Sequence, residues 1–326
     1  MRRHPLIAAA LIVGVLATAC GDDGSADAGS ADTPTIAVTT SVLGDVVSEM
    51  TGDLATVDVV MPANVDPHEF QLSARDAADL READVVVANG AGFEAGLEET
   101  IHGAEDDGTV VFEAIDHVAT LQVAEDAPAE EDEHADEEGE GDEAHEGVDP
   151  HFFNDPDRMA TAAEALSGFL ADEVPALDTA AFRDRAAAYV AELRALDAEV
   201  EATLAVVPPE RRKLVTNHDV FAYFADRYGF EVVGAVIPST TTQASASAGE
   251  IDALAATIVA QGVPAIFADT SSPEDLADTL ASEVGGDIAV VALYSESLGE
   301  PGSGADTYAG MMRTNAARIA EALAPA

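Results

Sequence analysis

Short β-branched runs alternate with longer amphipathic stretches through the first half of the chain. Runs rich in Val, Ile and Thr predict strands, and apolar residues spaced three or four apart predict helices. The predicted strands are residues 35–42, 55–62, 84–89 and 109–114, and the predicted helices are 43–50, 73–82 and 93–103. Ser73 and Asp76 have the spacing of a helix-capping box. Because strands and helices alternate, we predict parallel strands with crossover helices, and therefore an α/β fold.

The same alternation returns in the second half, after a long helical pattern at 179–206 that Pro208 and Pro209 end. Its predicted strands are 213–216, 231–237, 265–268 and 288–293, and the predicted helices around them are 220–228, 248–261, 273–283 and 306–323. One more helix, predicted at 157–171, precedes the long pattern and belongs to the first half. We therefore predict two similar lobes with parallel sheets. The N-terminal lobe is 35–178, the linking helix is 179–207 and the C-terminal lobe is 208–326.

The first residues indicate export and do not belong to the predicted fold. Arg2 and Arg3 precede an apolar run, and small residues then precede Cys20, the single cysteine of the chain. This order predicts a signal peptide at 1–19, and the residues around Cys20 resemble a bacterial lipobox. We expect a lipid on Cys20, a flexible tether at 20–34 and a location on the outer face of the cytoplasmic membrane.

The chain is strongly acidic, with 63 Asp and Glu against 14 Lys and Arg and a formal net charge of −49. Nucleic acid is excluded as a partner because its binding requires phosphate neutralisation. Cations are attracted to such a surface, although acids that only keep a protein soluble give the same bulk charge. The charge is densest at 125–147, which holds thirteen acids together with His134 and His145. We predict a disordered loop there, which is either a weak auxiliary metal site or has no specific role.

Three histidines stand in loops at the ends of predicted strands. His68 and His151 share the sequence Asp-Pro-His, His218 ends a strand of the second lobe, and Glu296 follows its last strand. Open α/β lobes bind ligands beyond the carboxyl ends of their strands. Imidazoles with one carboxylate suit Zn²⁺ and are acceptable to Mn²⁺. A single loop histidine is usually an ordinary surface residue, but the repeated motif in two matched lobes favours one ion in the cleft between them.

Aspartates beside these histidines are candidates to hold the imidazole N–H groups. They are Asp66, Asp149, Asp155 and Asp219, and their order along the chain does not show which of them does so. His102 and His117 fall outside the motifs, and we expect them at the surface or in the core.

The motifs, taken in order, resemble those of the zinc- and manganese-binding receptors of bacterial ABC importers, in which a rigid helix links the lobes. They include Asp-Pro-His-Glu-Phe at 66–70, Ala-Asp-Val-Val-Val-Ala-Asn-Gly at 83–90, Asp-Pro-His at 149–151, His-Asp-Val-Phe-Ala-Tyr-Phe-Ala at 218–225 and Asp-Thr-Tyr at 306–308. The resemblance covers nearly everything after the tether. Members of this family often carry an acidic, histidine-containing insertion where 125–147 stands.

The resemblance implies that His68, His151 and His218 are the first three metal ligands. Histidine at the third position suggests zinc, where glutamate suggests manganese. The fourth ligand of the family is usually an aspartate, and here Glu296 stands in its place, with Asp269 as the reserve candidate.

The resemblance also implies an ABC permease and its cytosolic ATPase as partners of a monomer that is not an enzyme. The chain departs from the family at Asn154, where an aliphatic residue is common, and at Gln-Ala-Ser 243–245, where Glu-Pro-Ser is usual. We expect neither departure to touch a ligand. Two alternatives are a metal-binding surface adhesin and, with less support, a secreted zinc hydrolase. Four protein ligands would close the zinc shell against a catalytic water, and the chain has no His-Glu-x-x-His motif.

Overall fold

A computed structural model describes residues 33–123, 147–272, 275–286 and 288–325. The predicted signal peptide, Cys20, most of the tether, and the acidic loop with His134 and His145 lie outside these residues. The boundaries predicted for two lobes and a linker within the described chain stay a prediction.

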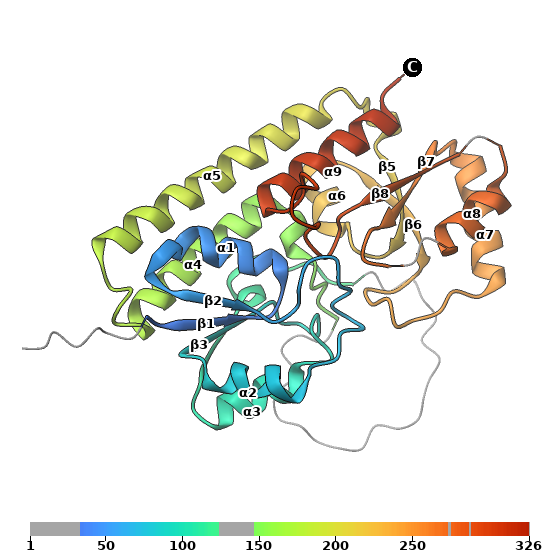
Figure 1. The fold of residues 1–326 in the computed structure, drawn as a ribbon. Helices are drawn as coiled ribbons and strands as arrows, with labels where there is room; N and C mark the ends of the chain where they lie inside the picture. Colours follow the sequence, from blue (N-terminus) through green and yellow to red (C-terminus); the bar gives the residue numbers. More distant parts are fainter. Residues whose placement is uncertain (1–32, 124–146, 273–274, 287, 326) are drawn as a thin grey trace, which may run out of the picture. The chain divides into compact units, whose positions relative to one another are not determined.

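The first sheet consists of four parallel strands in the order β2-β1-β3-β4 (Figure 1). They are β1 (Thr35–Val38), β2 (Thr56–Val59), β3 (Val85–Ala88) and β4 (Val110–Glu113). Ile36 of β1 is in register with Val57 of β2 on one side and with Val85 of β3 on the other. The direction of the strand order therefore reverses between β1 and β3, and the carboxyl ends of the strands at such a point are the usual place for a ligand.

Successive side chains of a strand point to opposite faces of the sheet, and helices cover both faces of this one. The helices of this half are α1 (Ser41–Thr51), α2 (Ala74–Glu82), α3 (Glu98–Asp106) and α4 (Pro156–Glu173), with short 3₁₀ turns η1 (Gly52–Leu54), η2 (Ala114–His117) and η3 (Phe152–Asn154). Ile36 and Val38 belong to the apolar cluster that includes α1 and α4, whereas Ala37 belongs to a cluster with α2 and α3.

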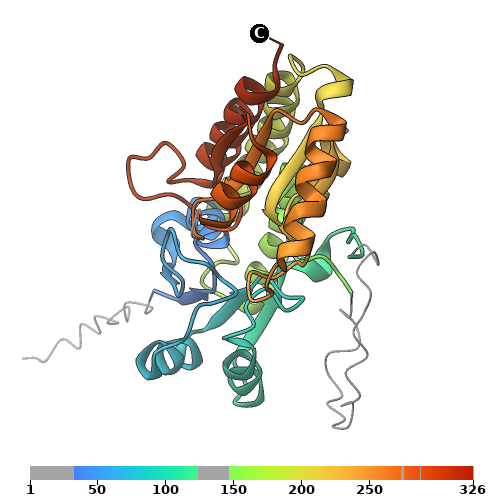
Figure 2. The ribbon, with the colours of Figure 1, turned by 90° about the vertical axis from the view of Figure 1, so that its right-hand side faces the viewer.

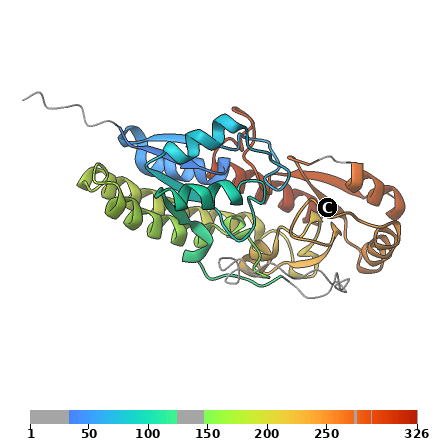
Figure 3. The same cartoon turned by 90° about the horizontal axis from the view of Figure 1, so that it is seen from below.

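The longest helix, α5 (Ala180–Leu204), packs against α4 and α1 from the first half and against α9 from the second. Figure 3 shows α4 and α5 side by side, in green and yellow-green. Phe182, Leu193 and Leu204 along α5 are buried in one apolar cluster. One helix therefore contributes core residues to both halves of the described chain.

The second sheet repeats the first in its order, β6-β5-β7-β8, and all its strands are again parallel. The strands are β5 (Lys213–His218), β6 (Glu231–Ile237), β7 (Ala265–Asp269) and β8 (Ala289–Leu293), and the helices are η4 (Pro209–Arg211), α6 (Ala222–Tyr228), α7 (Ala248–Gln261), α8 (Asp275–Val284) and α9 (Tyr308–Leu323). Leu214 and Phe267 join the same large cluster as α5, whereas Val215 and Ile266 face α7 and α8. Figure 2 shows α7 and α8 (orange) across this sheet from α9 (red).

This arrangement confirms the predicted α/β class with two parallel sheets. A single apolar cluster joins one face of each sheet through α1, α4, α5 and α9, and residues from Thr33 onward form one compact unit. Within the described residues, no helix combines the length and apolar character needed to cross a bilayer.

Two of the element boundaries that differ from prediction have a local reason. The strand predicted to reach residue 42 ends at Val38, because Thr40 caps α1 by accepting from the N–H of Leu43. The helix predicted from 93 begins at Glu98, after a turn in which Gly90, Ala91 and Gly92 all have positive φ.

The capping box predicted at Ser73 is formed only in part. The Ser73 hydroxyl accepts from the backbone of Asp76, and its own proton goes to the Asp76 carboxylate. A complete, reciprocal box occurs instead at Ser247 and Glu250 of α7.

Candidate metal centre

Four buried side chains from four different loops converge on one point. One ligand atom from each of His68, His151, His218 and Glu296 lies within 4.8 Å of the other three. Glu296 Oε1 is 2.8 Å from His68 Nε2, 3.3 Å from His151 Nε2 and 2.9 Å from His218 Nε2. Donor atoms around a tetrahedral Zn²⁺ are about 3.3 Å apart at its usual bond lengths. The cluster therefore has the composition and the compactness of a four-coordinate metal site.

The two Asp-Pro-His sequences form the same local turn. Asp66 Oδ1 accepts from the backbone N–H of His68, and Asp149 Oδ1 accepts from that of His151, both at 2.9 Å. A short carboxylate that bonds the backbone two residues on is the usual Asx turn. The repeated motif is therefore a repeated way of turning the chain so that the imidazole enters the site.

His218 and Glu296 come from the second sheet. His218 is the last residue of β5, and Glu296 follows β8. The loop of Glu296 is held by the first half of the chain, because Leu298 N–H donates to Ser41 Oγ at 3.1 Å and Asn64 N–H donates to the Leu298 carbonyl at 2.9 Å. Both sheets thus present carboxyl-end loops to the site, as their order predicts.

Of the four aspartates considered beside the histidines, Asp149 is the one that holds an imidazole ring. Its Oδ1 lies 2.7 Å from His151 Nδ1, which leaves Nε2 facing the cluster. Burial lowers the pKa of His151, but the carboxylates of Asp149 and Glu296 outweigh it and raise the pKa to about 9. The free site therefore binds a proton on His151 at neutral pH.

The electrostatics of His218 and Glu296 are complementary. Burial lowers the pKa of His218, and the facing Glu296 carboxylate outweighs burial and raises it overall. Burial likewise raises the pKa of Glu296, yet His218 and the hydrogen bonds from the three imidazoles hold that pKa well below its usual range. Within the described residues, His218 Nδ1 and Glu296 Oε2 have no hydrogen-bond partner. The second carboxylate oxygen is thus free to join a coordination shell.

The aromatic ring of Phe93 packs against the first two ligand candidates. The ring of Phe93 meets His68 edge to face at 5.1 Å between centroids, and it meets His151 at 5.6 Å. Next to it, burial raises the pKa of Glu94 to about 7, although hydrogen bonds from Thr39 and from backbone N–H groups lower it. Phe93 and Glu94 closely follow the motif at 83–90, but their contacts with the site depend on the tertiary fold.

The other predicted candidates lie outside the cluster. Asp269 ends β7 and accepts hydrogen bonds from Ser295 and Ser271, and it is not among the four converging groups. Asp155 caps α4. His102 and His117 are exposed, and His117 stacks on a phenylalanine of β4.

Asp219, another of the four aspartates considered beside the histidines, is mostly buried. Burial raises its pKa to about 6, although the charge of the neighbouring His218 lowers it.

One of the two family departures touches a residue of the cluster, which corrects the expectation that neither would. The Gln243 side chain donates to the main-chain carbonyl of His68. The Asn154 side chain donates to the carbonyls of Val220 and Ser295, which stand near ligand candidates and are not themselves in the cluster. These contacts are made to main-chain oxygens, for which the sequence carries no signal.

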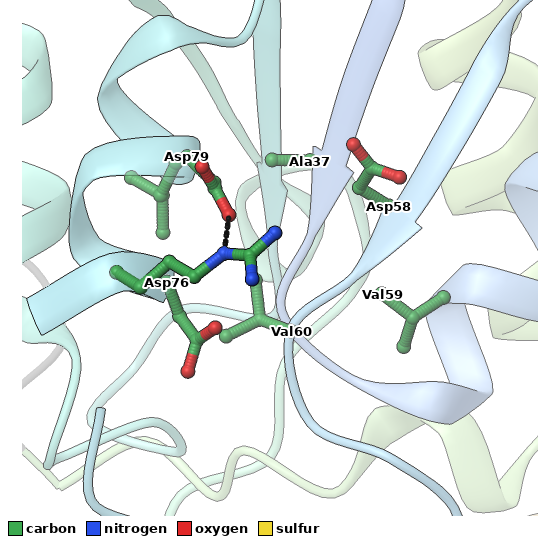
Figure 4. A pocket seen from close by; sticks show the side chains of 8 residues that line it. Ala37, Asp58, Val59, Val60, Asp76 and Asp79 are labelled. Atoms are coloured by element: carbon green, nitrogen blue, oxygen red, sulfur yellow. Dashed lines mark ion pairs between the residues drawn. The ribbon is translucent and has the colours of Figure 1, made fainter. Parts of the chain in front are cut away.

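A hollow of about 310 Å³ beside β2 and α2 has a different character (Figure 4). Asp58, Asp76 and Asp79 line it, and Asp79 pairs with Arg75 at 3.5 Å. Both side chains of this ion pair are mostly exposed, and the lining contains no histidine. This hollow therefore lacks the imidazole donors that the buried cluster offers.

Comparison with known proteins agrees with this geometry. The family model described as "Zinc-uptake complex component A periplasmic" matches residues 36–322. The chain belongs to this family. The match includes both sheets, α5 and all four residues of the cluster.

Individual relatives cover almost the whole chain. "Zinc-binding protein TroA" of Treponema pallidum is 31% identical over 333 residues, which is 99% of this chain and 100% of the relative. "Manganese-binding lipoprotein MntA" of Bacillus subtilis is 29% identical over 327 residues, with 98% and 99% covered. The solved structure of periplasmic TroA superimposes with a TM-score of 0.77 at 29% identity, over 90% of this chain and 100% of that one.

Proposed function

We propose that this chain binds one divalent transition-metal ion, Zn²⁺ in preference to Mn²⁺, through His68, His151, His218 and Glu296. It is the extracytoplasmic substrate-binding protein of a metal ABC importer. The ion is its cargo, which it delivers to a membrane permease driven by a cytosolic ATPase. A lipid on Cys20 would keep a monomer at the outer face of the membrane.

The observation that carries the proposal is the convergence of three imidazole Nε2 atoms on one carboxylate oxygen in a buried site. Nitrogen donors with a single carboxylate suit tetrahedral Zn²⁺, whereas Mn²⁺ favours more oxygen donors and a higher coordination number. One relative is named for zinc and the other for manganese, and the names therefore do not decide between the two metals. The choice of zinc rests on the donor set of this chain.

The donor set also argues against a hydrolase. A catalytic zinc keeps one position for water or substrate, and four protein donors fill a tetrahedral shell. The buried cluster gives no support to the adhesin alternative, because a surface contact would not use side chains with 0–1% exposure.

Competitive calorimetry of the metal-stripped protein with Zn²⁺ and Mn²⁺ tests the proposal. We expect one tight Zn²⁺ site that His218→Ala loses and that His102→Ala, a change at an exposed histidine outside the cluster, retains. The structural reason is that removing one of four ligands opens the shell to water. Only weak, multiple binding that His218→Ala leaves unchanged would refute the proposal.

A further inference from the structure

Asn154 is a buried amide at the junction of the two halves of the chain. It is the last residue of η3 and is 0% exposed. Its Nδ2 donates to two main-chain carbonyls of the second half, those of Val220 at 3.1 Å and Ser295 at 3.2 Å. One side chain thus joins two carbonyl-bearing residues that are 75 positions apart in the sequence.

Both acceptors stand directly beside metal-ligand candidates. The first lies two residues after His218, and the second immediately precedes Glu296. Asn154 itself ends the 3₁₀ turn that follows His151. Its side chain therefore joins the loop of His151 to the segments that carry His218 and Glu296.

The chemistry of the contacts fixes the orientation of the amide. Carbonyl oxygens only accept, so the nitrogen of Asn154 must face both of them. Its Oδ1 is buried and has no partner within the described chain. A buried polar atom without a partner costs free energy, and a leucine of similar shape would fill the space without that cost. The amide is thus poorly explained by packing and well explained by the two bonds that it donates.

We propose that Asn154 is a positioning residue for the metal site. Its amide sets the spacing of the His218 and Glu296 loops relative to the His151 loop before the ion arrives. This inference rests on the proposed function, because it assigns the residue a role in holding the metal donors. A donor set that is held in place binds more tightly and releases its ion more slowly than one whose loops move independently.

Asn154→Leu tests the role of the two donated bonds. We expect Zn²⁺ affinity to fall by about 10- to 100-fold, the usual effect of losing a group that orients metal ligands, with faster release to a chelator. Co²⁺ bound in place of Zn²⁺ should show a changed visible absorption spectrum, because that spectrum reports ligand geometry. The melting temperature of the metal-free variant should fall modestly, because the carbonyls of Val220 and Ser295 lose their donor.

Thr51→Val is the matched control. Thr51 is 0% exposed, and its hydroxyl donates at 2.8 Å to Val47 within α1, so the change also removes a buried hydrogen bond but touches no ligand loop. We expect the control to release Zn²⁺ at the rate of the unaltered chain and to keep its Co²⁺ spectrum.

The outcomes separate this inference from the proposed function. An unaltered chain with no tight, single Zn²⁺ site refutes the proposed function. A chain with that site, whose Asn154→Leu variant keeps the same release rate and Co²⁺ spectrum, overturns the role of Asn154 alone. Should the leucine variant fail to fold, Asn154→Ala decides by the same readouts, because it removes the donor and introduces neither bulk nor charge.

Discussion

At the scale of single residues, a proton and a metal ion would compete for the same imidazole in the proposed site. His151 is hydrogen-bonded through Nδ1 to Asp149, and its pKa is raised to about 9. A metal ion needs the deprotonated Nε2, so each ion that binds at neutral pH must displace a proton.

We therefore predict that Zn²⁺ affinity rises with pH from about 6 to about 9 and then levels off, because the fraction of deprotonated His151 increases over that range. Calorimetry at pH 7 in two buffers with different ionisation heats should show proton release on binding. Binding that releases no proton would contradict the assignment of His151 as a ligand.

The stability of the metal-free fold should change with pH in the opposite direction to the Zn²⁺ affinity. A histidine whose folded pKa is raised stabilises the fold fully below its unfolded pKa of about 6.5. This contribution is lost as the pH rises through the folded value of about 9. Bound metal and a bound proton therefore stabilise the same site at opposite ends of the pH range.

Residue types and their spacing in the sequence predicted the members of the cluster but not the groups that hold them. His68 and His151 share a motif, and Glu296 follows a recognisable strand. Asn154 and Gln243 escaped prediction because they bond to main-chain carbonyls, which every residue carries. Such pairings depend on the tertiary fold, and the side-chain type alone does not reveal them.

At the scale of elements, α5 is attached to the second half by a buried charge as well as by apolar packing. Asp197 is 7% exposed and accepts from Arg227 Nε at 2.8 Å and from Tyr228 OH at 3.1 Å, both on α6. The pKa of Tyr228 is raised above its usual value, chiefly by burial and then by this carboxylate.

We predict that Asp197→Ala lowers the free energy of unfolding by about 1.5–3 kcal/mol, the usual range for hydrogen bonds to a charged group. Glu199→Ala on the same helix is the control, because its pairing with Arg313 is exposed on both sides and should contribute less than about 1 kcal/mol. Urea denaturation measures both. Equal effects of the two changes would show that the buried position of Asp197 adds nothing.

The ends of a helix could be predicted from the sequence where local interactions decide them, and could not where the conformation of the preceding turn decides them. The long pattern at 179–206 predicted α5 to within two residues at either end. The start of α3 was missed by five residues, because three successive positive-φ residues from Gly90 to Gly92 keep the chain in a turn. Nothing in the residue type of Ala91 indicates that its φ is positive.

At the scale of the whole molecule, the formal charge of −49 acts against the compact state. Like charges repel over a Debye length, which falls from about 30 Å at 0.01 M salt to about 3 Å at 1 M. The folded chain therefore carries a self-repulsion that added salt should relieve.

We predict that the melting temperature of the metal-free protein rises as NaCl increases from about 0.01 to about 1 M, over the range in which screening becomes complete. Differential scanning calorimetry measures the change. A melting temperature that stays constant or falls would mean that the acidic side chains lie too far apart to repel one another.

The four ligand candidates have 0–1% exposure, and this sets the timing of exchange. A chelator in solution cannot reach a buried ion, so it must wait until the loops part. Once the chelator is concentrated enough to capture every released ion, a higher chelator concentration no longer increases the rate of metal release. The residence time of the cargo is then governed by how often the protein opens, and a membrane partner that parts the loops can empty the site without weakening any metal–ligand bond beforehand.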